Sequence, residues 1–197
     1  MVISERNRCI FVHIQKTGGS SLEAVLRAND PGIGSSLHEG RRHLFARQIR
    51  PLVGAERWNA YFKFAFVRNP WDRLVSWYHM CVQVPQPNAF ARYVRACAPT
   101  FEAFVTQATT GMGERTTYNQ VDYITDEAGA PIVDFVGRYE SLREDFAHVR
   151  DRLALPFDLP HVNRSDHLHY RDYYSRATRD IVAQRFARDI AYFGYAF

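Results

Sequence analysis

The sequence has few cysteines and no long apolar run, and these shortages exclude several classes of protein. Its three cysteines, Cys9, Cys81 and Cys97, form neither the spacing of a metal site nor an even set for disulfide bonds. We expect all three to be small buried apolar residues, as suits a reducing compartment. No apolar run reaches the length of a membrane-spanning helix, and residues 1–8 are polar, unlike a signal peptide. We therefore predict a cytoplasmic protein without an integral membrane span.

The sequence also lacks a strong excess of charge and is poor in lysine. Its net charge of +4 is a mild bias toward anionic ligands. No dense basic stripe with interleaved aromatic residues indicates a nucleic-acid partner. Of the 25 basic residues only Lys16 and Lys63 are lysines, which indicates that a compact ammonium is preferred where Lys16 lies. With 197 residues, 46% of them hydrophobic, the chain can bury a sizeable core, and we predict a single domain over residues 1–197.

The strongest pattern that is present is a strand, a tight polar loop and a helix start within residues 9–23. A short apolar run of β-forming side chains predicts a strand covered on both faces, and it consists of Ile10, Phe11, Val12 and Ile14. Ser20 and Glu23 have the spacing of a capping box, which predicts that a helix begins there.

The loop between this strand and this helix predicts an anion site. Gly18 and Gly19 allow unusual backbone angles and let a ligand approach the main chain. The N-terminus of the following helix supplies free N–H groups and the positive end of the helix dipole. Lys16 adds a mobile positive charge. A Walker A loop places its Lys-Ser/Thr pair after the last glycine, whereas Lys16 and Thr17 precede the glycines here.

A second junction of strand and helix spans residues 62–78. Its first six residues predict a central strand, Asn69 is a good N-cap, and Pro70 is a good first helical residue. One helical face for the core is formed by Trp71, Leu74, Val75 and Tyr78. Arg68 is thereby placed at the carboxyl end of a strand, where open α/β sheets bind ligands, and Ser76 lies two turns along the helix.

Together these two junctions resemble those of sulfotransferases that use 3′-phosphoadenosine 5′-phosphosulfate (PAPS), in particular the bacterial and Golgi carbohydrate sulfotransferases. The resemblance implies that the 5′-phosphosulfate is bound by Lys16, Thr17, Gly18, Gly19, Ser20 and Ser21. It implies that Arg68 and Ser76 hold the 3′-phosphate, since a guanidinium fork and a hydroxyl are suitable donors to phosphate oxygens. It further implies that Lys16 neutralises charge on the leaving oxygen and that no metal is needed.

The remaining segments resemble the family less closely. Residues 132–137 predict another strand, which leads into an aromatic-Glu-x-Leu turn at residues 139–142. Gln120 lies in a segment similar to one near the active site of the family, but its spacing assigns it no role. Arg164 lies in a basic loop that resembles a mobile segment near the nucleotide, so it either covers the phosphates or is exposed to solvent.

A general base is needed to take the proton of a hydroxyl acceptor, and we predict that it is His43. Histidine has an unperturbed pKa near neutrality, which suits this role. His43 precedes a helical stretch that Pro51 is expected to end, and it matches the place of a catalytic histidine in several carbohydrate sulfotransferases. His38 is the alternative. His13, inside the first strand, is expected to be a core or sheet residue.

These patterns predict an α/β fold with a mostly parallel central sheet, helices on both faces and a P-loop-like unit of strand, loop and helix. The resemblance implies transfer of a sulfuryl group from PAPS, as co-substrate, to a hydroxyl-bearing small molecule or glycan, with a carbohydrate favoured. Two alternatives stay open. A nucleotide or sugar kinase should carry a lysine after the glycines. A non-catalytic module of the same fold would bind 3′,5′-ADP or a glycan and transfer nothing.

Overall fold

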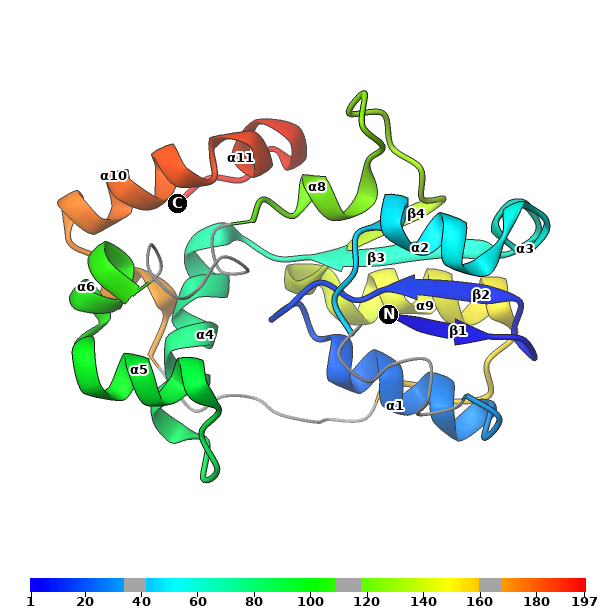
Figure 1. The fold of residues 1–197 in the computed structure, drawn as a ribbon, viewed down its shortest axis with the longest axis horizontal. Coiled ribbons are helices and arrows are strands. Elements are labelled where there is room, and N and C mark those ends of the chain that lie inside the picture. The colour runs from blue at the N-terminus through cyan, green and yellow to red at the C-terminus, as the bar shows by residue number, and fades with distance from the viewer. Residues whose placement is uncertain (34–41, 109–117, 160–167) are drawn as a thin grey trace. The chain divides into compact units, whose positions relative to one another are not determined.

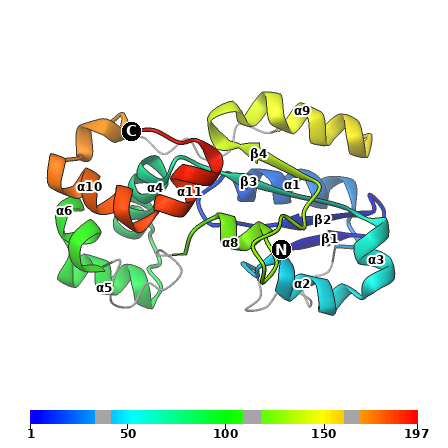
Figure 2. The ribbon, with the colours of Figure 1, turned by 90° about the horizontal axis from the view of Figure 1, so that it is seen from above.

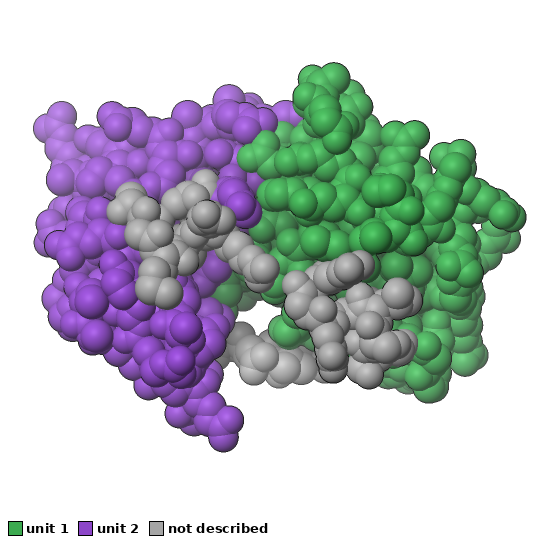
Figure 3. Space-filling model, in the orientation of Figure 1, with its two compact units in different colours: residues 1–68, 120–163 green, residues 69–119, 164–197 purple. Residues whose placement is uncertain are grey.

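The computed structural model of the chain describes all residues except 34–41, 109–117 and 160–167. The chain divides into two compact units, which Figure 3 shows in different colours and which are described separately below. Unit 1 comprises Met1–Arg68 and Gln120–Asn163, and unit 2 comprises Asn69–Asn119 and Arg164–Phe197. The expectation of a single functional domain over the whole chain stays a prediction.

Unit 1 is built on a four-stranded sheet with the order β1-β2-β3-β4 (Figure 1). The strands are β1 (Val2–Ser4), β2 (Cys9–Val12), β3 (Phe62–Val67) and β4 (Phe135–Arg138). β1 is antiparallel to β2, whereas β2, β3 and β4 are parallel to one another. Val12 pairs with Ala65, and Val67 pairs with Arg138. The carboxyl ends of the three parallel strands therefore lie at the same edge of the sheet.

Helices cover both faces of this sheet, which confirms the predicted α/β architecture. The helices of unit 1 are α1 (Gly19–Asn29), α2 (Ala46–Val53), α3 (Ala55–Ala60), α8 (Val121–Ile124), a 3-10 helix (Tyr139–Ser141) and α9 (Leu142–Leu153). α1 and α9 lie on one face, and α2 and α8 lie on the other, as the two views in Figure 1 and Figure 2 agree. Phe11, Phe64 and Phe66 point toward the first face and form one buried cluster with Leu22 of α1 and Val149 of α9.

Unit 2 is helical in the residues that the structure describes. Its elements are α4 (Pro70–Gln83), α5 (Ala89–Cys97), α6 (Phe101–Ala103), a π-helix (Phe104–Ala108), a 3-10 helix (Tyr170–Tyr173), α10 (Arg176–Arg185) and α11 (Ala187–Phe193). The Asn69 side chain accepts a hydrogen bond of 3.1 Å from the Trp71 amide, and Pro70 is the first residue of α4, as predicted. The predicted apolar face of α4 packs into a buried cluster with residues of the π-helix and of α10.

Three local predictions were wrong. α1 begins at Gly19 with Gly18 as its N-cap, and no side chain caps it, so Ser20 does not form a capping box. The left-handed conformation of Gly18, with φ of 83°, closes the turn earlier in the chain. Pro51 does not end α2 but lies inside it, two residues before its last residue, Val53. Cys97 is exposed at the end of α5, whereas Cys9 and Cys81 are buried as expected.

No helix within the described ranges is long and apolar enough to cross a membrane.

Gly137 in β4 offers a test of the packing of the sheet. A Cβ atom at this position would lie 2.4 Å from Cε1 of Phe66, whose ring is fully buried and contacts Phe64 and Phe135. We expect Gly137→Ala to lower the free energy of unfolding by about 1–3 kcal/mol, because the ring has no free space to enter. Urea denaturation measures this change.

Gly32→Ala is the matched control for that substitution. A Cβ atom there would meet only Oδ1 of Asp30, at 3.2 Å, and both substitutions restrict the unfolded chain equally. If the two variants lose the same stability, the contact between Gly137 and Phe66 does not constrain the sheet.

Candidate functional site

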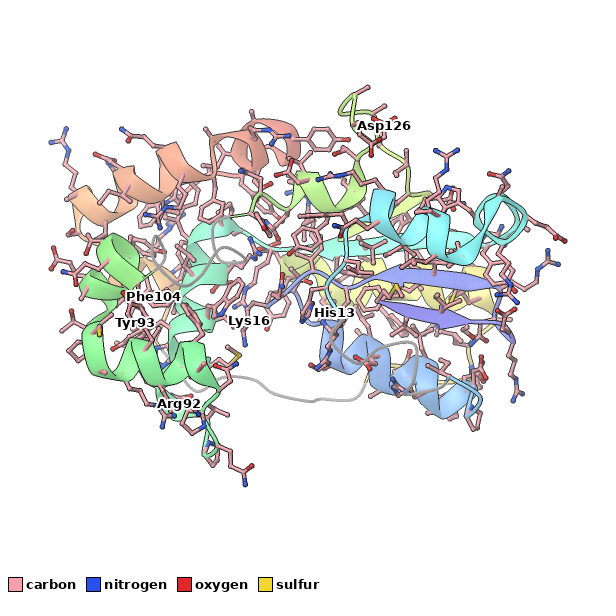
Figure 4. The ribbon with its side chains drawn as sticks, in the orientation of Figure 1. His13, Lys16, Arg92, Tyr93, Phe104 and Asp126 are labelled. Carbon is pink, nitrogen blue, oxygen red and sulfur yellow. The ribbon has the colours of Figure 1, made fainter. Side chains whose placement is uncertain are left out.

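The candidate site lies at the edge of the unit 1 sheet where the three parallel strands end. The loop of residues 13–18 follows β2, Arg68 follows β3, and Tyr139 follows β4. Figure 4 labels His13 and Lys16 in the first of these segments. The carboxyl edge is where open α/β sheets place their ligands, so these three segments supply the candidate residues.

The loop after β2 is held in a tight turn. Lys16 and Gly18 both have left-handed backbone conformations, with φ of 67° and 83°. The Thr17 side chain is buried and donates a hydrogen bond of 3.0 Å to the carbonyl of Ile14. A left-handed conformation costs a lysine about 1 kcal/mol, and backbone strain of this kind gathers at ligand sites. The turn leads directly into α1, and the N-terminus of a helix attracts anions through its dipole.

The ring of His13 supports the start of α1. His13 is buried, with 4% of its surface exposed, and it stacks on Phe11 with ring centres 5.2 Å apart. A Cβ atom at Gly19 would lie only 2.1 Å from Nε2 of His13. His13 is therefore a core residue, as expected, but its ring also fills the space beside Gly19 that a side chain would need.

Glu23 of α1 lies beside Nδ1 of the His13 ring, where two arginines pair with it. Its carboxylate is 3.7 Å from Nδ1 of His13 and pairs with Arg27 at 3.0 Å and Arg42 at 2.9 Å. These neighbours, His13 foremost, hold the pKa of the Glu23 carboxyl well below its usual range. Burial lowers the pKa of His13, so its imidazole is neutral. Among the described residues, the carboxylate of Glu23 beside the loop after β2 is thus paired with two arginines.

His43 is brought beside the same loop from the segment that precedes α2. Its Nδ1 lies 2.8 Å from the backbone carbonyl oxygen of His13, and the two rings meet edge to face at 4.7 Å. A carbonyl can only accept, so Nδ1 carries the proton and Nε2 is left as an acceptor. Burial lowers the pKa of His43 to about 3. His38, the alternative base, lies outside the described residues.

Three groups fix Arg68: the Gln120 side chain bonds to its backbone, the Lys16 carbonyl accepts from its guanidinium, and the Tyr139 ring packs on the guanidinium face. Nη1 donates a hydrogen bond of 3.3 Å to the carbonyl of Lys16, and Cζ lies 3.9 Å from the centre of the Tyr139 ring. The Gln120 side chain accepts from the Arg68 amide at 2.9 Å and donates to the Arg68 carbonyl at 2.8 Å. Tyr139 also contacts the loop, since a Cβ atom at Gly18 would lie 3.3 Å from its ring. Arg68 thus contacts the loop after β2, and the predicted roles of both segments at a nucleotide stay predictions.

Two further predicted site residues, Ser76 and Arg164, are not placed relative to this group. Ser76 is buried on α4, with 6% of its surface exposed, and belongs to unit 2, whereas Arg68 belongs to unit 1. Their shared role at one phosphate stays a prediction. Arg164 lies outside the described residues.

Four residues that contact these groups carried no predicted ligand-binding or catalytic role: Glu23, Arg42, Gln120 and Tyr139. Tyr139 could have been found, because it follows a predicted parallel strand just as Arg68 does. Arg42 precedes His43 in the sequence, but nothing in its spacing indicates a pair with Glu23. Gln120 bonds only to backbone atoms of Arg68 in the contacts given above, and such a contact leaves no pattern of side-chain types.

The chemistry of this edge is suited to an anion. It combines a lysine, an arginine and the N-terminus of an 11-residue helix. Within the described ranges, no group of three or more His, Cys, Asp or Glu residues could hold a metal ion.

Gly19→Ala tests the contact between α1 and His13. We expect it to lower both stability and anion affinity, because the new Cβ atom would overlap the imidazole. His13→Ser in the same chain should restore part of both losses by removing that ring. Thermal melting and calorimetric titration with 3′,5′-ADP measure the two effects.

Gly18→Ala is the comparison variant. Its Cβ atom would meet Leu142 and Tyr139, and its backbone φ is positive, so His13→Ser should not repair it. Equal repair of both glycine variants would mean that the contact with His13 is not what requires glycine at position 19.

The profile of a family described as the sulfotransferase family matches residues 1–196. An uncharacterized protein from Archaeoglobus fulgidus is 30% identical over 125 residues, which cover 58% of this chain and 85% of that protein. The family match includes the lysine loop, Arg68, Gln120 and Tyr139, and it extends over both units. The chain belongs to the sulfotransferase family.

Proposed function

We propose that this protein is a PAPS-dependent sulfotransferase that moves a sulfuryl group to a hydroxyl of a carbohydrate or glycan. Membership of the family makes it a transferase of sulfuryl groups. The observation that carries the finer proposal is the contact between its two predicted donor-binding segments. The guanidinium of Arg68 donates to the carbonyl of Lys16, inside the anion loop. One ligand with phosphate groups at both ends of a ribose could therefore engage both segments.

In this proposal the anion loop takes the 5′-phosphosulfate. Its residues are Lys16, Thr17, Gly18, Gly19, Ser20 and Ser21. Arg68 and Ser76 take the 3′-phosphate, for which a guanidinium fork and a hydroxyl are good donors. Arg164 covers the phosphates. No metal is required, because Lys16 and the N-terminus of α1 supply the positive charge that offsets the phosphosulfate.

The reaction is an in-line displacement at sulfur. The acceptor oxygen forms a bond to sulfur while the bond from sulfur to the 5′-phosphate oxygen breaks, and 3′,5′-ADP leaves. Lys16 neutralises the charge that develops on the leaving oxygen, which stabilises the transition state more than the ground state. The acceptor proton passes to the general base.

His43 is the proposed base, with His38 as the alternative. The hydrogen bond from Nδ1 of His43 to the carbonyl of His13 supports this role, because it leaves Nε2 as the acceptor. The low pKa of His43 makes it a weaker base than an ordinary histidine. A bound phosphosulfate would bring negative charge close to the ring and raise that pKa.

The second candidate is a non-catalytic module of the same fold that binds 3′,5′-ADP or a glycan. A transfer assay with labelled PAPS and a panel of hydroxyl acceptors separates the two.

We infer as well that both units act as one sulfotransferase domain over residues 1–197, supported by a family match that spans them. A cytoplasmic location and the absence of a nucleic-acid partner remain predictions from composition.

Nucleotide preference tests the donor site. We expect 3′,5′-ADP to bind more tightly than 5′-AMP, because only the former carries the phosphate that Arg68 would meet. A charge-assisted hydrogen bond contributes about 1.5–3 kcal/mol. Arg68→Ala should therefore raise the dissociation constant of 3′,5′-ADP by about tenfold or more and leave that of 5′-AMP unchanged. Calorimetry measures the four dissociation constants.

Arg57→Ala is the matched control for the loss of one positive charge. Arg57 lies on α3, where it is exposed and pairs with Glu5. It should leave the preference unchanged. Equal affinity of the wild-type protein for both nucleotides would refute the assignment of PAPS as donor.

His43→Ala tests the base. We expect the transfer rate to fall by about 10²–10⁴-fold with 3′,5′-ADP affinity near wild type, as loss of a general base should do. His148→Ala, which removes an exposed histidine of α9, is the control. Because the pKa of His43 is about 3, the ring stays neutral above about pH 4. Protonation of His43 should therefore cause no decrease in the kcat/KM of the wild type near pH 6.5. A decrease near pH 6.5 that is present in the wild type and absent in His43→Ala would contradict this.

Normal transfer by His43→Ala with loss of transfer by His38→Ala would move the role to His38. Normal transfer by both variants would place the base elsewhere.

A further inference from the structure

The side chain of Gln120 pairs with the backbone of Arg68 in the way that a neighbouring strand would. Its Oε1 accepts from the Arg68 amide at 2.9 Å, and its Nε2 donates to the Arg68 carbonyl at 2.8 Å. Gln120 is fully buried and Arg68 is 5% exposed. Both residues belong to unit 1.

This pairing begins where the sheet ends. Val67 is the last residue of β3 and pairs with Arg138 of β4. Beyond that pair a buried N–H and a buried C=O need new partners, since leaving them unsatisfied is costly. A carboxamide is the side-chain group that can accept and donate at the same time, as a peptide unit does. Gln120 thus extends the hydrogen bonding of β3 by one residue, up to Arg68.

The guanidinium of Arg68 is fixed independently of its backbone. It donates to the Lys16 carbonyl at 3.3 Å and lies on the ring of Tyr139 at 3.9 Å. An arginine side chain otherwise loses considerable rotamer entropy when it meets a ligand. With its backbone held by Gln120 and its head held by these two groups, Arg68 is already in place before a phosphate binds.

Resting on the proposed function, we infer that Gln120 is a positioning residue that sets the preference of the site for a nucleotide with a 3′-phosphate. It acts through Arg68 and does not touch the ligand. The chain leaves unit 1 after Arg68 and returns to it at Gln120, so the two hydrogen bonds between these residues join the exit point to the return point. A shift of this return segment would therefore move the backbone of Arg68.

The test uses Gln120→Met, which keeps the length of the side chain and removes both hydrogen bonds. We expect the dissociation constant of 3′,5′-ADP to rise by about tenfold or more and that of 5′-AMP to change by less than about twofold. In an Arg68→Ala background, Gln120→Met should not change the ratio of the two constants further. Hydrogen exchange should show faster exchange of the Arg68 amide in Gln120→Met than in wild type.

Thr125→Val is the matched control for lost stability. Thr125 is buried just after α8, and its hydroxyl donates to the carbonyl of Val121 at 3.0 Å, so this variant also loses a buried side-chain hydrogen bond. It should lower the melting temperature without altering the nucleotide ratio. A ratio that also changes in Thr125→Val would show that general destabilisation, and not Gln120, sets the preference.

The remaining outcomes separate this inference from the proposed function. If wild type prefers 3′,5′-ADP and folded Gln120→Met keeps the full preference, Gln120 is structural only and the inference is overturned. If Gln120→Met changes the ratio equally in the Arg68→Ala background, it does not act through Arg68. If wild type shows no preference, the proposed donor fails, and the inferred role in setting the preference fails with it.

Discussion

The loop after β2 depends on the absence of one side chain. Gly19 has no Cβ atom, and the imidazole of His13 occupies the space in which one would lie. This contact ties the first residue of α1 to the strand interior, because His13 itself stacks on Phe11 of β2. The backbone carbonyl of His13 then accepts the hydrogen bond that orients His43. One histidine in the loop after β2 therefore sets the position of the helix N-terminus and of the proposed base.

The same arrangement decides which groups carry charge at the sheet edge. Burial lowers the pKa of both His13 and His43, so neither ring adds positive charge near neutrality. The carboxylate of Glu23 would oppose an incoming anion, but Arg27 and Arg42 pair with it. The groups that we propose for the ligand are the ammonium of Lys16, the guanidinium of Arg68 and the N-terminus of α1. These are groups that bind phosphate or sulfate without changing their protonation.

The sequence predicted those parts of the fold that follow from periodicity and from local backbone chemistry. The run at residues 62–67 is a strand, and Asn69 with Pro70 starts the next helix, because capping and a fixed φ act within a few residues. The helix start near Ser20 was predicted with the wrong cap, since a left-handed Gly18 competes with a side-chain cap and only the folded turn decides between them. Contacts to backbone atoms were not predictable. Gln120 could have bonded to any exposed strand end, and only the tertiary structure places it at Arg68.

Lys16 and Arg68 lie at one edge of the sheet, but the shape and mobility of their charged groups differ. Arg68 uses its planar face on Tyr139 and an N–H on the carbonyl of Lys16 at the same time, which an ammonium cannot do. Lys16 lies on a strained, left-handed turn and carries a compact charge on a flexible stem. In the proposed reaction the phosphate at Arg68 keeps its charge throughout, whereas charge grows at the leaving oxygen beside Lys16. A fixed cation suits the constant charge and a mobile one suits the changing charge, which accounts for a lysine in the loop of a chain whose basic residues are otherwise almost all arginine.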